Sequence, residues 1–163
     1  MPHEELIAAL DYDRETGLWR WRYRPDRDQS WNTRYANTEA GVLRPDGYRY
    51  IRLNGERCLG SRLAWFFVTG EWPSGEIDHA NGNPSDDRWQ NLRQATRTQQ
   101  CGNSRRSRRN ASGLKGVWFH KQKGRFTAQC DHKHLGLFDT AEQAHAAYLA
   151  AARVKFGEFA RGG

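Results

Sequence analysis

An aspartate and a histidine stand side by side at Asp78-His79, and together these side chains could activate water for hydrolysis. Histidine titrates near neutral pH, so its ring can take a proton from water under ordinary conditions. Asn91 follows twelve residues after His79, and its amide could bond the ring and fix the tautomer that a working base requires. Asp78, His79 and Asn91 are therefore the candidate chemical group.

A short strand over 76–79 must carry the Asp-His pair, and a polar loop over 81–87 must return the chain to a second strand near Asn91. Neighbouring side chains of a strand point to opposite sides, so Asp78 and His79 can serve one site only where the strand end twists or breaks. The Asn, Gly and Pro residues of the loop permit such a break. A lone histidine is more often structural, but this surrounding pattern favours a functional one.

The rest of the first hundred residues has the pattern of a small mixed domain. The spacing predicts a helix over 4–10, a strand over 18–23, a loop over 31–37, a hairpin of strands 48–53 and 56–59 turning at Asn54-Gly55, and a short buried helix over 61–68.

Residues 77–103 resemble the HNH endonuclease superfamily, in its phage and intron-encoded branch with a ββα metal fold. The motifs that carry the resemblance are Asp78-His79, the Asn81-Gly82-Asn83-Pro84 loop and Asn91-Leu92-Arg93. The resemblance implies that Asp78 holds a divalent metal, that His79 is the general base and that Asn91 orients it. It also implies a second metal ligand on the following helix at position 100.

Position 100 is Gln where the family has Asn, and Asn103 lies three residues further along the expected helix, on roughly the same face. The Gln100 amide oxygen is a hard ligand suitable for Mg²⁺ (or Mn²⁺), but it lies one methylene further out, and Mg²⁺ demands near-ideal octahedral geometry. The implied activity is hydrolysis of double-stranded DNA. The alternative is a catalytically weakened or inactive DNA-binding protein on the same scaffold.

Residues 111–163 have a strand-strand-strand-helix pattern, with strands over 116–120, 125–130 and 132–138 and a helix that begins near Thr140. Motifs such as Leu135-Gly136-Leu137-Phe138 and Phe156-Gly157-Glu158-Phe159 resemble the Apetala/ethylene-response-factor DNA-binding domain. By alternation, Val117, Phe119, Phe126 and Ala128 would face the helix. The resemblance places the opposite face in the DNA major groove, with these candidate DNA-binding residues: Lys115, Trp118, His120, Arg125, Thr127, Gln129 and His134.

The charge of the chain is unevenly distributed. Of 26 Lys and Arg against 19 Asp and Glu, residues 1–104 hold 14 Arg and 15 acidic residues, whereas residues 105–163 hold 12 basic and 4 acidic residues. A basic linker over 105–110 contains Arg105, Arg106, Arg108 and Arg109 and would grip phosphates. We therefore expect an α+β protein with an HNH domain at 1–104, this linker, and a DNA-binding domain at 111–163.

Composition excludes several other classes of protein. The chain has 163 residues with 37% apolar and 12% aromatic residues, including seven Trp, so it should fold, as one domain or two small ones. Three cysteines without a close pair favour neither a disulfide framework nor a zinc site. No stretch predicts a membrane span or a signal peptide, and nothing predicts a small-molecule cofactor. We expect a cytoplasmic protein of a bacterial host or phage; RNA binding is the less favoured alternative.

Overall fold

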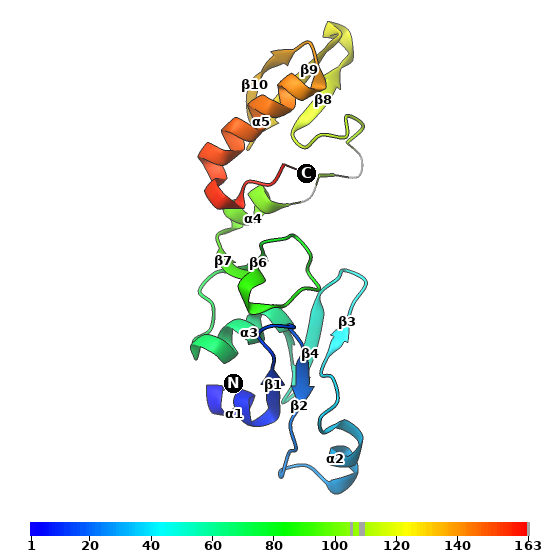
Figure 1. The fold of residues 1–163 in the computed structure, drawn as a ribbon, viewed down its shortest axis with the longest axis vertical. Helices are drawn as coiled ribbons and strands as arrows, with labels where there is room; N and C mark the ends of the chain where they lie inside the picture. The colour runs from blue at the N-terminus through cyan, green and yellow to red at the C-terminus, as the bar shows by residue number, and fades with distance from the viewer. Residues whose placement is uncertain (105, 108–109, 163) are drawn as a thin grey trace. The chain divides into compact units, whose positions relative to one another are not determined.

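The computed structural model describes residues 1–104, 106–107 and 110–162, which form a mixed α and β fold with several small antiparallel sheets (Figure 1). The chain divides into two units, Met1–Ala95 and the segment from Thr96 onward. In the part of the chain that the structure describes, no helix is long and apolar enough to cross a membrane.

The first unit alternates short helices with two- and three-stranded sheets. Its elements are α1 (His3–Ala9), β1 (Leu10–Tyr12), β2 (Trp19–Trp21), α2 (Gln29–Tyr35), β3 (Val42–Leu43), β4 (Arg49–Leu53), β5 (Glu56–Leu59), α3 (Gly60–Thr69), β6 (Glu76–His79) and β7 (Leu92–Ala95). Strands β1 and β2 form one sheet, β3, β4 and β5 a second, and β6 and β7 a third. All pairs are antiparallel.

The β4–β5 hairpin confirms the turn that the sequence predicts. Asn54 and Gly55 both have positive φ, 50° and 85°, as a two-residue type I′ turn requires. Along β4 the side chains of Ile51 and Leu53 are buried while Arg52 between them is exposed, because successive residues of a strand face opposite sides. The buried side joins the core of the first unit together with Leu63 of α3.

Helix α2 corrects the prediction of a loop over 31–37. Asp28 caps the helix, its Oδ1 accepting a hydrogen bond from the backbone N–H of Trp31 at 2.7 Å. The Trp31 ring lies edge-on to Trp21 of β2, and the buried Asn32 side chain bonds the backbone of Arg24. These tertiary contacts hold the short helix, and the Asp28 cap was the sequence signal for it.

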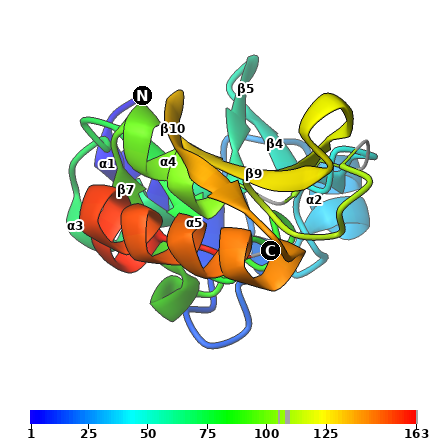
Figure 2. The same cartoon turned by 90° about the horizontal axis from the view of Figure 1, so that it is seen from above.

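The second unit contains α4 (Arg97–Asn103), β8 (Val117–His120), β9 (Arg125–Cys130), β10 (Lys133–Phe138) and α5 (Ala141–Phe156). The strands form one antiparallel sheet in the order β10-β9-β8, and α5 packs along one face of it (Figure 2). Thr140 caps α5 as predicted, accepting a bond from the N–H of Gln143. Between sheet and helix lies a small core of Val117, Ala128 and Ala144.

Helix α4 belongs to the second unit, although the charge distribution placed the domain boundary after residue 104. Gly102 of α4 lies so close to α5 that a Cβ there would come within 2.6 Å of Cγ of Phe156. The Lys115 ammonium also donates a hydrogen bond to the Gly102 carbonyl at 2.7 Å. The division therefore falls between Ala95 and Thr96, at the end of β7.

Candidate active site

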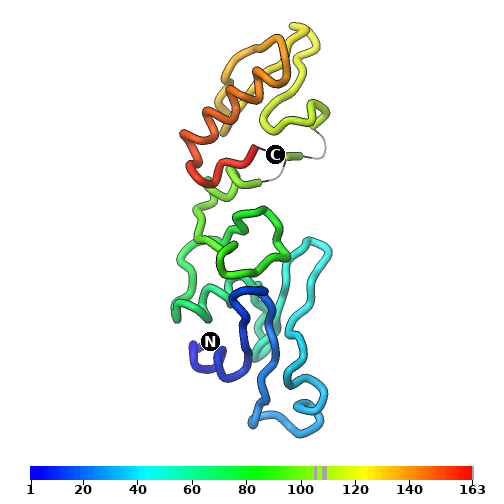
Figure 3. Tube along the Cα trace, in the orientation of Figure 1, coloured from blue at the N-terminus to red at the C-terminus, as the bar shows by residue number. Residues whose placement is uncertain are grey.

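The candidate site is built on the β6–β7 hairpin and the loop that joins its strands (Figure 3). Turn hydrogen bonds and hydrogen bonds of short polar side chains, rather than regular strand pairing, hold this loop. The Gly82 N–H donates to the His79 carbonyl at 2.7 Å, and the Asn83 N–H donates to Oδ1 of Asn81 at 2.8 Å. The chain thus turns sharply directly after His79, where the sequence predicted that the strand would break.

Asp78 is buried and paired across the hairpin with Arg93. The two residues are cross-strand partners, and Nε of Arg93 donates to Oδ2 of Asp78 at 3.0 Å. Only 5% of the Asp78 surface is exposed, and a buried carboxylate of this kind needs a cationic or hydrogen-bonding partner. The arginine of the Asn-Leu-Arg motif supplies that partner.

His79 is equally buried, at 5% exposure, and its ring is held by a carboxylate that the sequence analysis did not single out. Nε2 of His79 lies 3.0 Å from Oδ1 of Asp87, which is 3% exposed. An ionised carboxylate only accepts hydrogen bonds, so Nε2 carries the proton and donates it to this bond. Asp87 thereby fixes both the orientation and the tautomer of the ring.

Tyr48 borders both members of the Asp-His pair. Its ring lies edge-on to the His79 ring, with centroids 5.9 Å apart. Burial raises the pKa of the Tyr48 hydroxyl, and the carboxylates of Asp46 and Asp78 raise it further. Tyr48 therefore contacts the His79 ring, and the charge of Asp78 raises its pKa. This tyrosine joins the hairpin to the sheet of β3, β4 and β5.

Asp87 is itself held by contacts from distant parts of the first unit. The Tyr12 hydroxyl donates to the Asp87 backbone carbonyl at 2.5 Å, and burial followed by the Asp87 charge raises the Tyr12 pKa. A Cβ at Gly60 would come within 2.5 Å of Oδ2 of Asp87, and that buried oxygen has no hydrogen-bond partner among the described residues. The carboxylate thus fits a tight space, and His79 is the partner that its Oδ1 bonds among the residues that the structure describes.

Asn91 has a different partner from the one the sequence predicted. Its Oδ1 accepts from the Asn81 N–H at 2.9 Å, and its Nδ2 donates to the Asp86 carbonyl at 2.8 Å. The residue ends a short 3₁₀ turn before β7, and its amide spans the loop instead of reaching the ring of His79. Asn91 thus shapes the loop that presents Asp87, and the ring bond that we predicted for it is made by that aspartate.

Gln100 and Asn103 both lie on α4, which begins with a capping box formed by Thr96 and Gln99. Gln100 is half-buried and Asn103 is buried. Three residues apart on a helix, they share roughly one face. Both belong to the second unit, whereas Asp78 and His79 belong to the first.

The donor types of the implied metal site suit a hard divalent cation. A carboxylate such as Asp78 and amide oxygens such as those of Gln100 and Asn103 are ligands that Mg²⁺ or Mn²⁺ accept, usually with water and substrate phosphate completing the shell. No group of three or more His, Cys, Asp and Glu side chains gathers among the residues that the structure describes, so a purely acidic or histidine cage is not formed there.

The open face of the β8–β10 sheet carries part of the predicted DNA-binding set. Trp118 is exposed, as are Arg125 and His134, while His120 and Gln129 are half-buried. Thr127 lies on the same face but is only 2% exposed, because it occupies the central strand between Trp118 and Leu137, its partners on either side. Phe119, predicted to face the helix, is 50% exposed at the sheet edge, where its ring packs edge-on against Phe126.

Several predicted basic contacts are engaged within the protein. Lys115 donates from Nζ to the carbonyls of Gly102 and Ser104, and Arg125 forms an ion pair with Asp139 at 2.8 Å. Arg106 is exposed and donates to the Asn110 carbonyl at 3.1 Å. The other linker arginines, Arg105, Arg108 and Arg109, lie outside the described residues.

Comparison with known proteins gives one family match. A family model described as HNH endonuclease matches residues 59–100, a segment that runs from the end of β5 into α4. The segment contains Asp78, His79, Asp87, Asn91 and Gln100. No curated protein and no solved structure matches the chain significantly.

Proposed function

From the HNH endonuclease domain at residues 59–100 we propose that the chain hydrolyses phosphodiester bonds of double-stranded DNA, with His79 as the general base. The observation that carries this proposal is the buried bond between Nε2 of His79 and Oδ1 of Asp87, inside the matched segment. A histidine held in one orientation by a carboxylate is the arrangement that general-base catalysis requires.

In this proposal His79 takes a proton from the attacking water while Asp87 holds the ring through Nε2. The Asp87 carboxylate then stabilises the positive ring that results, at a distance of 3.0 Å. The water oxygen bonds to phosphorus, the bond to the 3′ oxygen breaks, and that oxygen takes a proton from solvent, which leaves a 5′ phosphate and a 3′ hydroxyl. Asn91 and the loop backbone keep Asp87 in place.

In this proposal Asp78 is a ligand of the divalent metal, and Gln100 and Asn103 are the candidate amide ligands that the resemblance implies. When bound, Mg²⁺ or Mn²⁺ neutralises charge on the scissile phosphate and stabilises the leaving oxygen. Arg93 holds the Asp78 carboxylate in a fixed position through its bond to Oδ2.

The second unit and the basic linker would deliver this site to the duplex. Helix α5 covers one face of the β8–β10 sheet, and the other face displays Trp118, Arg125 and His134. The excess of positive charge in residues 105–163 supports a polyanionic partner for this unit. In this proposal the sheet face opposite α5 lies in the DNA major groove, as the resemblance to the Apetala/ethylene-response-factor domain implies.

A supercoiled plasmid tests the catalytic role. We expect Mg²⁺- or Mn²⁺-dependent nicking that a chelator stops, that His79→Ala abolishes, and that His132→Ala, which alters an exposed histidine of the β9–β10 turn, leaves intact. Gel shifts should show unchanged DNA binding by His79→Ala. No nicking under any divalent metal, together with salt-sensitive binding, would favour the second candidate, a DNA-binding protein without catalysis, which the glutamine at position 100 supports.

A further inference from the structure

Five exposed arginines of the first unit make no side-chain hydrogen bond or ion pair with any residue that the structure describes: Arg14, Arg34, Arg44, Arg52 and Arg57. Most arginines there are engaged, for example Arg49 with Glu39 at 2.5 Å and Arg88 with Asp86 at 2.7 Å. The side chains of Arg44, Arg52 and Arg57 belong to this group of five, and none of the three guanidinium groups bonds or ion-pairs with a described residue. Their charges are therefore available to an external partner.

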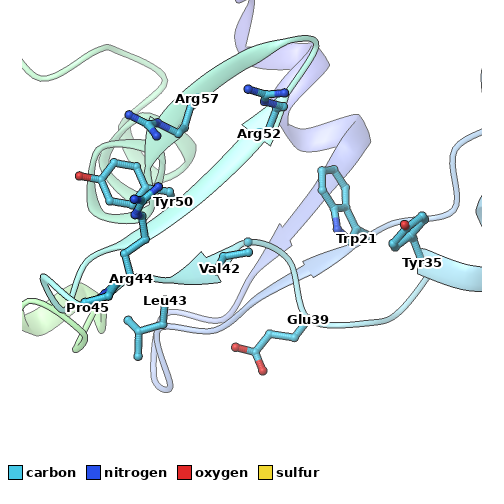
Figure 4. A pocket seen from close by; sticks show the side chains of 11 residues that line it. Trp21, Tyr35, Glu39, Val42, Leu43, Arg44, Pro45, Tyr50, Arg52 and Arg57 are labelled. Atoms are coloured by element: carbon cyan, nitrogen blue, oxygen red, sulfur yellow. The ribbon is translucent and has the colours of Figure 1, made fainter.

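The three arginines lie on the outer face of the β3–β4–β5 sheet, and two of them lie over the ring of Tyr50. Arg52 and Arg57 are direct cross-strand partners, an arrangement in which like charges destabilise a sheet. The guanidinium carbons of Arg57 and Arg44 lie 5.0 and 5.8 Å from the centroid of the Tyr50 ring. Figure 4 shows Arg44 and Arg57 beside this ring and Arg52 further along the same face.

These side chains line a surface groove whose other walls are mostly apolar. Val42 and Leu43 of β3 are exposed, and the rings of Trp21 and Tyr35 lie at the opposite end of the groove (Figure 4). Glu39 is the one acidic residue in the lining, and its charge is compensated by Arg49. The groove therefore has a net positive charge, and guanidinium groups suit phosphate oxygens because they can donate two parallel hydrogen bonds.

One turn connects this groove to the candidate active site. The Gly47 N–H donates to the Arg44 carbonyl at 2.8 Å, and a Cβ at Gly47 would come within 2.7 Å of Cγ of Pro84 in the β6–β7 loop. Tyr48 at the end of this turn contacts the ring of His79. The groove thus begins at the turn that packs on the site and continues along the sheet.

We propose that the groove binds the phosphate backbone of the DNA duplex beside the bond to be cleaved, with Arg44, Arg52 and Arg57 as the phosphate contacts. This inference rests on the proposed function for the identity of the polyanion. Bound phosphates would neutralise the two facing arginines, so the unfavourable pair in the free protein becomes favourable in the complex. An acidic protein segment is the competing occupant.

The test measures the salt dependence of binding to a generic duplex in the His79→Ala background. Replacing Arg52 and Arg57 with Gln should lower the log-log salt slope by about 1.8, at about 0.9 per lost phosphate contact. Raising the salt from about 50 to about 200 mM should therefore weaken DNA binding by the double variant about twelvefold less than it weakens binding by the protein that keeps both arginines. The control removes the same charge elsewhere, by Arg22→Gln with Arg27→Gln, two exposed arginines ion-paired with Asp11 and Asp26.

Each outcome decides the proposal. An unchanged slope, or an equal change in the control, overturns it, as does preferential binding of poly-glutamate over the duplex. Should the double variant fail to fold by circular dichroism, Arg44→Gln on the exposed turn should still lower the slope by about 0.9. Plasmid nicking is measured separately, with the protein that keeps His79. A lowered salt slope without nicking supports DNA binding by the groove and contradicts the endonuclease activity. Nicking with an unchanged slope supports the endonuclease activity and contradicts DNA binding by the groove.

Discussion

Nε2 of His79 lies 3.0 Å from Oδ1 of Asp87, and both side chains are almost completely buried. Asp87 is the eighth residue after His79, and the loop between them turns back so that the aspartate meets the ring. This carboxylate, and not the amide of Asn91, sets the orientation of the histidine. Asp87 is therefore the positioning residue of the candidate site.

Asp87→Asn should reduce the catalytic rate without reducing DNA binding. The amide keeps the size of the side chain but does not stabilise a protonated ring, so we expect kcat to fall by about 10- to 100-fold with KM nearly unchanged. The measurement is steady-state nicking of a plasmid. Asp86→Asn serves as the matched control, because its side chain bonds Arg88 and Asn81 rather than His79. Equal losses in both variants would reduce Asp87 to a structural role.

Gly60→Ala should act on the site through Asp87. Gly60 begins α3, and an added Cβ would come within 2.5 Å of Oδ2 of Asp87, which must then move relative to His79. We expect kcat to fall while thermal stability changes by less than about 1 kcal/mol, because alanine favours a helix over glycine by a similar amount. In an Asp87→Ala background the clash is gone, so Gly60→Ala should add no further loss of rate. Additive losses would contradict this coupling.

Asp86 should make the first unit sensitive to acid. The Arg88 side chain, followed by other hydrogen bonds that include one from Asn81, lowers the pKa of Asp86 to about 2 despite its partial burial. Because the folded pKa lies below the unfolded value of about 3.9, the stabilisation is complete above about pH 4 and is lost as the pH falls through about 2. Asp86→Asn should therefore destabilise by about 1 kcal/mol at pH 7, allowing for the exposure of Arg88.

Urea unfolding followed by tryptophan fluorescence measures this effect, since all the tryptophans except Trp118 lie in the first unit. The difference in free energy of unfolding between the wild-type protein and Asp86→Asn should narrow below about pH 4 and vanish near pH 2. A difference that stays constant down to pH 2 would mean that the carboxylate contributes through its shape and not through its charge.

Local patterns in the sequence were enough to predict much of the fold. The Asn54-Gly55 turn, the strand that carries Asp78 and His79, and the Thr140 cap of α5 all depend on residues close together in the chain. Asp87 could not be found in this way. Its position depends on Tyr12, which lies 75 residues earlier, and on the close approach of Gly60.

The second sheet shows a similar limit of pattern reasoning. Alternation correctly placed Thr127 on the face opposite Ala128, but alternation does not indicate whether neighbouring strands cover a residue. Thr127 is covered because β9 is the central strand, and its hydroxyl donates to the Gly136 carbonyl of β10 at 3.2 Å. The structure therefore gives it a packing role within the sheet.

Gln100→Asn should raise metal-dependent nicking if residue 100 is a ligand. Asparagine is one methylene shorter, so its amide oxygen restores the reach that the family motif has, and Mg²⁺ tolerates little deviation from octahedral geometry. The dependence of rate on Mg²⁺ concentration should move to lower concentration. Gln90→Asn, an exposed position before Asn91, is the control. If nicking does not increase, residue 100 is not a ligand, and either Asn103 or neither of the two residues binds the metal.

Lys115→Gln should weaken the second unit rather than its affinity for DNA. The sequence placed Lys115 among the DNA contacts, but its Nζ donates to the carbonyls of Gly102 and Ser104 at 2.7 and 2.6 Å, at the end of α4. Burial, and then the charge of Arg161, lower the Lys115 pKa, so the ammonium depends on these two carbonyls in place of water.

Loss of these charge-assisted bonds should cost about 2 kcal/mol, seen as a lower midpoint of thermal unfolding of the second unit. The salt slope of DNA binding should stay within about half a unit of the wild-type value, because no phosphate contact is lost. Replacing Arg105, Arg106, Arg108 and Arg109 with Ala gives the opposite expectation, a slope lower by up to about 3.6 with unchanged stability. If Lys115→Gln has normal stability and its salt slope falls by about 0.9, Lys115 contacts a DNA phosphate, as the sequence predicted.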